Sequence, residues 1–334
     1  MKLLLRGAES RDRIPTLKAN LTTSWSIDVW LEEQGQEAFA AHLGECDAMV
    51  SMRWPRDWPR APRLALLQLP GAGYDGVDFA EVPPQTWVCN VFEHEIGISE
   101  YVMAALLEWQ IGLRAMDAQI RRGDWRGTFS HPDGPRLHGE LFGKTLGLIG
   151  YGHISRAVAE RARAFDMRVL ACTRSPDKAA GDSLVERIDG MDGLARMLSE
   201  SDFVVVGCPL TEQTRGLIGA GEFAAMKPGA VIVNVARGGV IVEQALYDAL
   251  RSRRIGGAVI DVWYRYPGND AAGCLPSALP FHELDNIIMS PHASGLSEGL
   301  LERRWHRIAR NLDAIARGEP PANVLQAPGG RRPA

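Results

Sequence analysis

The sequence lacks the cysteine patterns that are typical of a zinc site or a disulfide framework. Its five cysteines are scattered, with no C-x-x-C pair among them. This distribution favours free thiols in a reducing compartment. We therefore expect no bound metal and no disulfide.

Long apolar runs and a strong net charge are also missing. No stretch approaches the ~20 apolar residues of a membrane span. The opening MKLLLRGAES has three leucines before an arginine, which is too short for a signal-peptide core. A net charge of −4 gives no general attraction to nucleic acid or anionic membranes. These features predict a cytoplasmic protein with neither nucleic acid nor membrane as a partner.

The sequence does contain short apolar runs that alternate with helical patterns over 334 residues. Such alternation predicts an α/β fold with parallel sheets, and this length favours two domains. The periodicity predicts helices at 32–43, 96–122 and 298–317, the last followed by a disordered polar tail. Strands are predicted within the apolar runs at 2–6, 46–52, 64–70, 87–91, 145–150, 167–172, 202–209, 230–236, 256–263 and 286–290.

The stretch LGLIGYGHIS at 146–155 predicts a strand, a tight glycine turn and a helix. Gly150 and Gly152 let the backbone approach a pyrophosphate, which the N-terminal amides of the helix can bind. The third glycine of the G-x-G-x-x-G fingerprint is Ser155, which is still small enough for close packing. We interpret the stretch as a dinucleotide-binding turn, with an ordinary tight turn as the alternative.

The next strand ends in Thr173, Arg174 and Ser175, without a carboxylate. Sites that prefer NAD hold the ribose 2′-hydroxyl with an acid at this point. An arginine there can instead bind a 2′-phosphate by charge-assisted hydrogen bonds. We therefore expect NADP to be preferred over NAD, the alternative being a surface loop that tolerates either cofactor.

Seven motifs occur in a characteristic order: LPGAGYDGVD at 69–78, ISEYVMAALL at 98–107, LGLIGYGHI at 146–154, CPLTEQTRGLI at 208–218, VNVARGGVIVEQAL at 233–246, GGAVIDVW at 256–263 and MSPHASG at 289–295. With them the chain resembles the D-isomer-specific 2-hydroxyacid dehydrogenases, which include glyoxylate/hydroxypyruvate reductases, phosphoglycerate dehydrogenase and formate dehydrogenase. The resemblance implies two Rossmann-like domains. A doubly wound dinucleotide domain at 96–292 is inserted into a discontinuous, flavodoxin-like substrate domain at 1–95 and 293–334. It also implies a homodimer formed through the helix at 98–122.

The resemblance assigns the catalytic roles to Arg237 and His292. A guanidinium can grip the carboxylate of a 2-oxo acid and polarise its carbonyl. An imidazole with pKa near ~6.5 can exchange a proton with the alkoxide. Substrate contacts are expected from Arg53 and Trp54 and from the amides of Gly71, Ala72 and Gly73. The cofactor contacts expected are Gly150, Gly152, His153, Ile154, Thr173, Arg174, Ser175, Cys208, Pro209, Thr214, Val235, Ala236 and Asp261.

The segment DVWYRYP at 261–267 departs from the family pattern, which is D-V-F-x-x-E-P. Asp261 keeps its place and is expected at the nicotinamide carboxamide, but Tyr266 occupies the position of the glutamate that supports the histidine. Formate dehydrogenases share the D-V-W and have glutamine in that position. A neutral phenol can orient His292 without stabilising its charged form. We therefore count Tyr266 with the catalytic residues and expect activity to fall off at lower pH than in relatives with the glutamate.

Three functions follow from these features. The first is reduction of a small 2-oxo acid, such as glyoxylate or hydroxypyruvate, or the reverse oxidation. The second is a non-catalytic regulator that senses a dinucleotide, which the missing glutamate favours and the retained Arg237 and His292 oppose. The third is oxidation of a formate-like anion, which the D-V-W segment keeps open.

Overall fold

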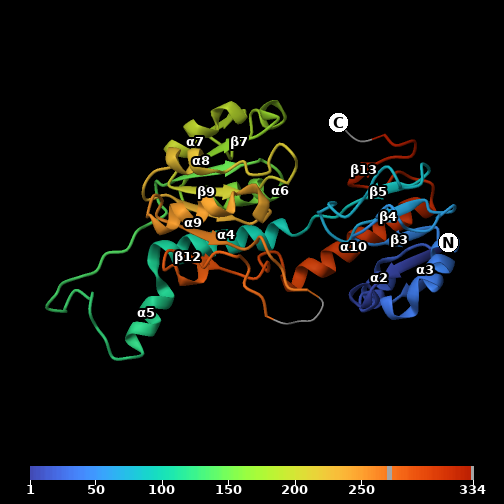
Figure 1. Cartoon of the computed structure of the whole chain (residues 1–334), viewed down its shortest axis with the longest axis horizontal. Helices are drawn as coiled ribbons and strands as arrows, with labels where there is room; N and C mark the ends of the chain where they lie inside the picture. The colour runs from blue at the N-terminus through green and yellow to red at the C-terminus, as the bar shows by residue number, and fades with distance from the viewer. Residues whose placement is uncertain (269–272, 332–334) are drawn as a thin grey trace. The chain divides into compact units, whose positions relative to one another are not determined.

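The structure, a computed structural model, describes residues 1–268 and 273–331 and divides into two units (Figure 1). The discontinuous unit comprises Met1–Glu93 and Ser297–Ala334, and the central unit comprises His94–Leu296. The assignment of substrate binding to the first and of dinucleotide binding to the second, within the predicted boundaries, stays a prediction.

The discontinuous unit has a six-stranded sheet in the order β13-β5-β4-β3-β1-β2. Strands β1 to β5 run parallel in the flavodoxin-like order 2-1-3-4-5, and β13 pairs antiparallel with β5. Its elements are β1 (Lys2–Arg6), α1 (Ala8–Arg11), α2 (Ile14–Asn20), β2 (Ser26–Trp30), η1 (Glu32–Gln34), α3 (Gly35–Glu45), β3 (Ala48–Val50), β4 (Leu66–Gln68), β5 (Trp87–Cys89), α10 (Glu298–Ala316) and β13 (Val324–Gln326). The tail after the last helix was predicted to be disordered. This prediction is wrong for Val324–Gln326, which form β13 and pair with β5.

Helices cover both faces of this sheet because successive strand residues point to opposite sides. Leu4 packs in the cluster that contains Phe39 of α3. Its neighbours Leu3 and Leu5 pack in the cluster that contains Leu17 of α2 and the apolar side of α10. The strands are therefore buried on both sides, as their continuous apolar runs predict.

The central unit has a seven-stranded parallel sheet in the order β12-β11-β10-β9-β6-β7-β8. The strand order reverses between β6 and β9, which is the arrangement of a doubly wound dinucleotide fold. Its elements are α4 (Glu95–Ile111), α5 (Leu113–Ile120), β6 (Thr145–Ile149), α6 (His153–Ala164), β7 (Arg168–Cys172), η2 (Pro176–Ala179), β8 (Arg187–Asp189), η3 (Met191–Gly193), α7 (Leu194–Glu200), β9 (Phe203–Val206), α8 (Ala220–Ala225), β10 (Val231–Asn234), η4 (Gly238–Val240), α9 (Glu243–Arg251), β11 (Gly257–Ile260), η5 (Phe281–Glu283) and β12 (Ile287–Met289). The predicted α/β class with two parallel-sheet units is confirmed.

Apolar side chains of the central sheet form one cluster on each face. One cluster contains the buried sides of α4 and α6, and the other contains those of α7, α8 and α9. The helices thus leave the carboxyl ends of the strands as an edge from which the loops emerge, and ligands of such sheets bind there.

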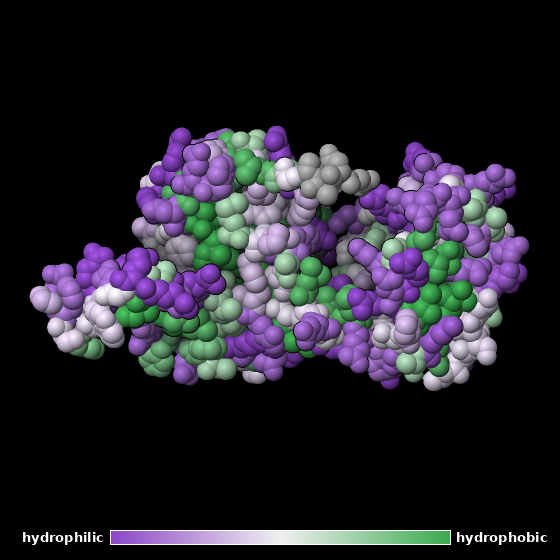
Figure 2. All heavy atoms as spheres, turned by 90° about the horizontal axis from the view of Figure 1, so that it is seen from below, coloured by the Kyte–Doolittle hydropathy of each residue, from purple (hydrophilic) through white to green (hydrophobic). Residues whose placement is uncertain are grey.

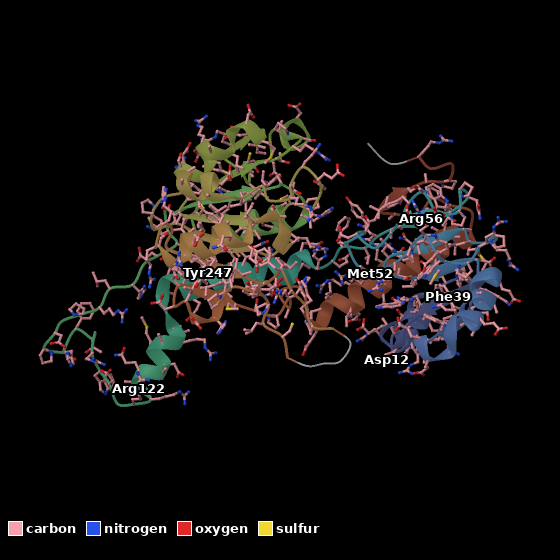
Figure 3. All side chains as sticks on the ribbon, in the orientation of Figure 1. Asp12, Phe39, Met52, Arg56, Arg122 and Tyr247 are labelled. Atoms are coloured by element: carbon pink, nitrogen blue, oxygen red, sulfur yellow. The ribbon has the colours of Figure 1, made fainter. Side chains whose placement is uncertain are left out.

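The single helix predicted over 96–122 is wrong, because the chain breaks at Gly112. This glycine adopts the left-handed conformation (φ 70°) that ends α4, and α5 starts directly after it. None of the residues of α5 is buried. We call residues 113–142 the arm. Figure 3 shows Arg122, just beyond α5, far from the central sheet.

Among the described residues, no helix has both the length and the apolar composition needed to cross a bilayer. The same part of the chain holds no group of three or more His, Cys, Asp or Glu side chains arranged for a metal ion. Of the free cysteines, Cys274 is exposed and the other four are buried.

Candidate active site

Most of the predicted site residues lie in loops that follow the strands of the central sheet. Because the strands are parallel, these loops emerge at one edge. The segments are Gly150–Ile154 after β6, Thr173–Ser175 after β7, Cys208–Pro209 after β9, Val235–Arg237 after β10, Asp261–Trp263 after β11 and Ser290–His292 after β12. The fold therefore brings the predicted cofactor and catalytic residues of this unit to the same edge.

The glycine turn after β6 has the geometry of a phosphate cradle. Gly150 has φ 82°, and a Cβ there would lie 2.8 Å from the Cβ of Cys208, so only glycine fits. A Cβ on Gly152 would meet nothing within 4 Å, so the space in front of the turn is open. Gly152 caps α6 without a side chain, which leaves the first amides of the helix for an anion. His153 and Ile154 form the first turn of α6, whose dipole also favours negative charge. These features fit a dinucleotide pyrophosphate.

Ser155 fills the third-glycine position without opening the fold. Its side chain is fully buried and lies so close to Gly207 that a Cβ on that glycine would collide with the hydroxyl. Two small residues therefore let α6 approach β9 closely. The Ser155 hydroxyl has no hydrogen-bond partner among the described residues, so it contributes small size rather than polarity.

The end of β7 presents an arginine and no carboxylate. Thr173 is anchored there by its amide, which donates to the carbonyl of Asp189 (3.0 Å). Arg174 is exposed and makes no hydrogen bond or ion pair within the described chain. The side chain of Asp189, on the neighbouring β8, is occupied by the guanidinium of Arg187 (2.7 Å). A guanidinium without a partner at this position can bind the ribose 2′-phosphate that NADP carries and NAD lacks.

The loop after β9 supplies a neutral wall. Cys208 is buried, and burial raises the pKa of its thiol to about 11, so the thiol stays protonated at neutral pH. The hydroxyl of Thr214 donates to the carbonyl of Pro209 (2.6 Å) and closes the loop on itself. Thr214 therefore shapes this loop.

The turn after β10 carries Arg237 and is held by Asn234, which is not among the predicted site residues. The side chain of Asn234 accepts from the amide of Ala236 (3.1 Å) and donates to the carbonyl of Arg237 (3.1 Å). Arg237 donates through Nη1 to the carbonyl of Ala236 (2.8 Å). Val235 and Ala236 are buried, which leaves the half-buried Arg237 as the polar group of this turn. A buried polar residue at the end of an apolar strand was the available signal.

Tyr266 contacts His292, as its place in the motif implies. The phenol oxygen lies 3.0 Å from Nδ1 of the imidazole. The amide of Trp263 donates to the same oxygen (3.1 Å). The phenol can therefore donate a hydrogen bond to a neutral imidazole or accept one from a charged imidazolium. In neither case does it place a negative charge beside the ring.

The environment of His292 disfavours its charged form. Its ring keeps an exposed face, yet partial burial lowers its pKa. The Arg237 guanidinium lowers that pKa further, whereas the carboxylate of Asp261 raises it. Arg237 and His292 follow β10 and β12, so their loops emerge at the same edge of the central sheet.

Asp261 is fully buried and faces the loop that carries His292. Its carboxylate accepts hydrogen bonds from the hydroxyl of Ser290 (2.5 Å) and from the amides of Ala293 (2.9 Å) and Ser294 (3.0 Å). The contact with a nicotinamide carboxamide stays a prediction.

In the discontinuous unit, the glycine loop at 71–73 leaves its amides available. The amides of Gly71, Ala72 and Gly73 donate no hydrogen bond to any described residue. The loop is instead held by its carbonyls, since Asn90 donates to Ala72 (2.9 Å) and the Val91 amide donates to Gly71 (3.2 Å). Free amides in a fixed loop can bind a carboxylate.

Arg53 and Trp54 lie in a loop that is joined to this glycine loop. The amide of Trp54 donates to the carbonyl of Gly76 (2.9 Å), and the Asp78 amide donates back to Trp54 (2.8 Å). The indole is 2% exposed and donates to the carbonyl of Glu81 (3.0 Å). Arg53 is exposed, like Met52 beside it, which Figure 3 labels. Trp54 therefore anchors the loop, and Arg53 is the member of the pair whose side chain reaches solvent.

Comparisons with known proteins agree with this arrangement. The family model for the NAD binding domain of D-isomer specific 2-hydroxyacid dehydrogenases matches residues 103–294. A glyoxylate reductase from Thermococcus gammatolerans is 33% identical over 315 residues, which cover 91% of each chain. A glycerate dehydrogenase from Methylorubrum extorquens is 32% identical over 270 residues, 80% of each chain. Among solved structures, a D-isomer specific 2-hydroxyacid dehydrogenase family protein from Aeromonas salmonicida is 25% identical, with a TM-score of 0.78, and covers 97% of this chain and 98% of that one.

Proposed function

The chain belongs to the D-isomer-specific 2-hydroxyacid dehydrogenase family, and on that premise we propose that it reduces a small 2-oxo acid to the D-2-hydroxy acid, or catalyses the reverse oxidation. As a member it is an oxidoreductase that uses a nicotinamide dinucleotide. The observation that carries the proposal is that Arg237 and His292 lie in loops that follow β10 and β12, at the same edge of the parallel central sheet.

Each residue has a distinct task in this reaction. The nicotinamide, when bound by the glycine turn and α6, supplies the hydride. Arg237 holds the substrate carboxylate and polarises the carbonyl. His292 gives its proton from Nε2 to the oxygen that gains negative charge, while Tyr266 holds Nδ1.

Glyoxylate and hydroxypyruvate are the substrates we propose to test first. Oxidation of NADPH and NADH, followed by absorbance with a panel of 2-oxo acids, should give turnover with at least one of them. Tight nucleotide binding without turnover on any acid supports a regulator instead. Reduction of the oxidised nucleotide by formate supports the third function.

The neutral phenol at His292 leads to a prediction about pH. His292 donates its proton only when charged, so reduction is lost as the pH rises through the pKa of His292. Because that pKa is lowered, the loss occurs at a lower pH than for an ordinary histidine. An opposite charge at contact distance typically moves a pKa by about 1–3 units. For the variant Tyr266→Glu, the pH at which kcat/KM for reduction falls off should therefore rise by about 1 unit or more. Tyr266→Gln is the uncharged control and should not move it; identical profiles for Tyr266→Glu and the wild type contradict the assignment.

We propose that NADP is preferred over NAD. The support is Arg174, exposed and without a partner in the described chain, at a strand end that has no carboxylate. Hydrogen bonds to charged groups contribute about 1.5–3 kcal/mol. Arg174→Ala should thus lower kcat/KM for NADPH by about tenfold or more, with that for NADH unchanged. An equal loss with both cofactors contradicts this role.

We propose a homodimer formed through the arm. Seven large apolar side chains of the arm are exposed, at 40–90%: Leu113, Met116, Ile120, Trp125, Phe129, Leu137 and Phe142. Figure 2 shows apolar side chains beside polar ones at this end of the central unit. Monomeric proteins rarely leave so much apolar area uncovered, and an isologous contact buries two copies of the same surface.

Light scattering tests the dimer directly. The wild-type protein should have twice the chain mass of 36.6 kDa. The double variant Trp125→Ser, Phe129→Ser should shift the mass toward that of one chain. A wild-type mass of one chain at micromolar concentration contradicts the proposal.

A further inference from the structure

The segment that carries His292 has an unusual backbone. His292 has φ 57°, in the left-handed region that non-glycine residues seldom adopt and that persists only where the surroundings enforce it. Neither neighbour is a glycine, since Pro291 precedes it and Ala293 follows it. The strain therefore needs a compensating interaction.

Asp261 provides that interaction. The left-handed turn is followed by two amides, those of Ala293 and Ser294, which both point at the Asp261 carboxylate. Consecutive amides in such a turn form a concavity that binds an anion. Here the anion is a side chain of the protein itself, and it comes from the residue directly after β11.

A third contact links Asp261 to the other end of the segment. Ser290 donates its hydroxyl to the carboxylate (2.5 Å), and the hydroxyl of Tyr101, on α4, lies 2.7 Å from that of Ser290. The Trp263 indole donates to the carbonyl of Ser290 (2.8 Å). Asp261 therefore binds the backbone and side chains on both sides of His292, and both carboxylate oxygens take part.

We propose that Asp261 is a positioning residue for His292: it enforces the left-handed turn that aims the imidazole, and it supplies from behind the loop the negative charge that the phenol of Tyr266 lacks. Positioning His292 would be a second role for Asp261, in addition to the expected contact with the cofactor. The inference rests on the proposed function only where turnover is measured. The segment after β11 then holds His292 at two points. Asp261 binds the backbone amides that follow His292, and Tyr266, itself bound by the Trp263 amide, contacts the imidazole ring.

The charges around the ring are consistent with this role. Burial opposes ionisation of Asp261, but the hydrogen bonds from Ser290, Ser294 and Ala293 outweigh it and hold the pKa of the carboxyl below its usual range. Asp261 is therefore charged wherever the enzyme is assayed. The charged groups that act on His292 are Asp261, which favours the imidazolium, and Arg237, which opposes it. Tyr266 touches the ring through its hydroxyl.

The test is the variant Asp261→Asn, measured in three ways. The kcat for reduction should fall by about tenfold or more, because a displaced catalytic group costs up to ~10²-fold per ångström. The dissociation constant for NADPH, from quenching of tryptophan fluorescence, reports separately on the expected carboxamide contact, and kcat at saturating NADPH should fall whether or not that constant changes. The pKa of His292, from ¹³C-histidine NMR without substrate or cofactor, should fall relative to the wild type. An NADPH affinity that drops while kcat is retained overturns the proposal, as does an unmoved His292 pKa.

A second variant covers the case in which Asp261→Asn does not fold. Ser290→Ala removes one hydrogen bond to the carboxylate and keeps the charge, so kcat should fall severalfold with the His292 pKa unchanged. Ser277→Ala is the matched control, because Ser277 also donates to a carboxylate, that of Glu243 (2.5 Å), in the same unit. Equal kcat values for the two serine variants overturn the proposal. The NMR titration needs no turnover, so it separates failure of this inference from failure of the proposed function.

Discussion

Replacing His292 with asparagine should lower kcat for reduction by about 10²–10⁴-fold, the usual contribution of a positioned acid or base. Asparagine is the sharpest choice because it is one of the few residues that readily adopts the left-handed backbone found at His292 (φ 57°). The loop should therefore keep its hydrogen bonds to Asp261, and the change removes only the proton donor. The measurement is steady-state nucleotide oxidation at saturating 2-oxo acid.

The control for this experiment is His282→Asn. His282 lies in η5 of the same unit and is exposed, with Nε2 3.9 Å from a carboxylate oxygen of Glu283 next to it. Its loss should leave kcat within twofold of the wild type. A His292→Asn enzyme that keeps more than a tenth of the wild-type kcat contradicts the role given to this residue.

Replacing Arg237 with lysine should lower kcat/KM by about 10²–10³-fold, the usual cost of removing one donor to an oxygen that gains charge. The planar guanidinium can hold a carboxylate with two parallel hydrogen bonds and still face the carbonyl, whereas an ammonium is a single flexible charge. The turn itself is fixed by Asn234 through backbone contacts, so it should survive the change. Binding of NADPH should remain within threefold, because the lost contacts are with the substrate.

Arg253→Lys is the matched control, since Arg253 ends in an exposed ion pair with Asp285 (2.6 Å). Exposed pairs of this kind contribute little, and kcat/KM should not change. If Arg237→Lys retains a tenth or more of the wild-type kcat/KM, the bidentate role of Arg237 is wrong.

Much of the fold could be predicted because its strands are continuous apolar runs. The runs ending near Ile149, Val206 and Ile260 are buried on both faces, so composition alone marks them. Elements that depend on distant partners were missed. Strand β13 forms because it pairs with β5. Strand β8 has the charged residues Arg187 and Asp189 at its two ends, so its sequence is not an apolar run.

The helix break at Gly112 was missed for a different reason. The periodicity of apolar residues continues through the glycine, so the pattern predicts one helix. The backbone nevertheless turns left-handed there, and the apolar side chains that follow lie exposed on the arm instead of in the core. Periodicity states which residues share a face but not what covers that face.

For the site, the order of motifs was enough to anticipate that Tyr266 and His292 would touch. Sequence could not give the direction of the hydrogen bonds around them or the partners of Asp261. Those depend on the left-handed turn at His292 and on Ser290, a serine that no motif marks as functional. The burial of Trp54 was likewise hidden, because a tryptophan beside prolines fits both a pocket wall and a loop anchor.

The most direct test of the account is the product itself. Purified protein, NADPH and hydroxypyruvate should yield D-glycerate in an amount equal to the NADPH oxidised, as measured by chiral chromatography, and glyoxylate should be consumed with the same stoichiometry. Nucleotide that binds but is not oxidised by any 2-oxo acid, or a product of the L configuration, would contradict the account.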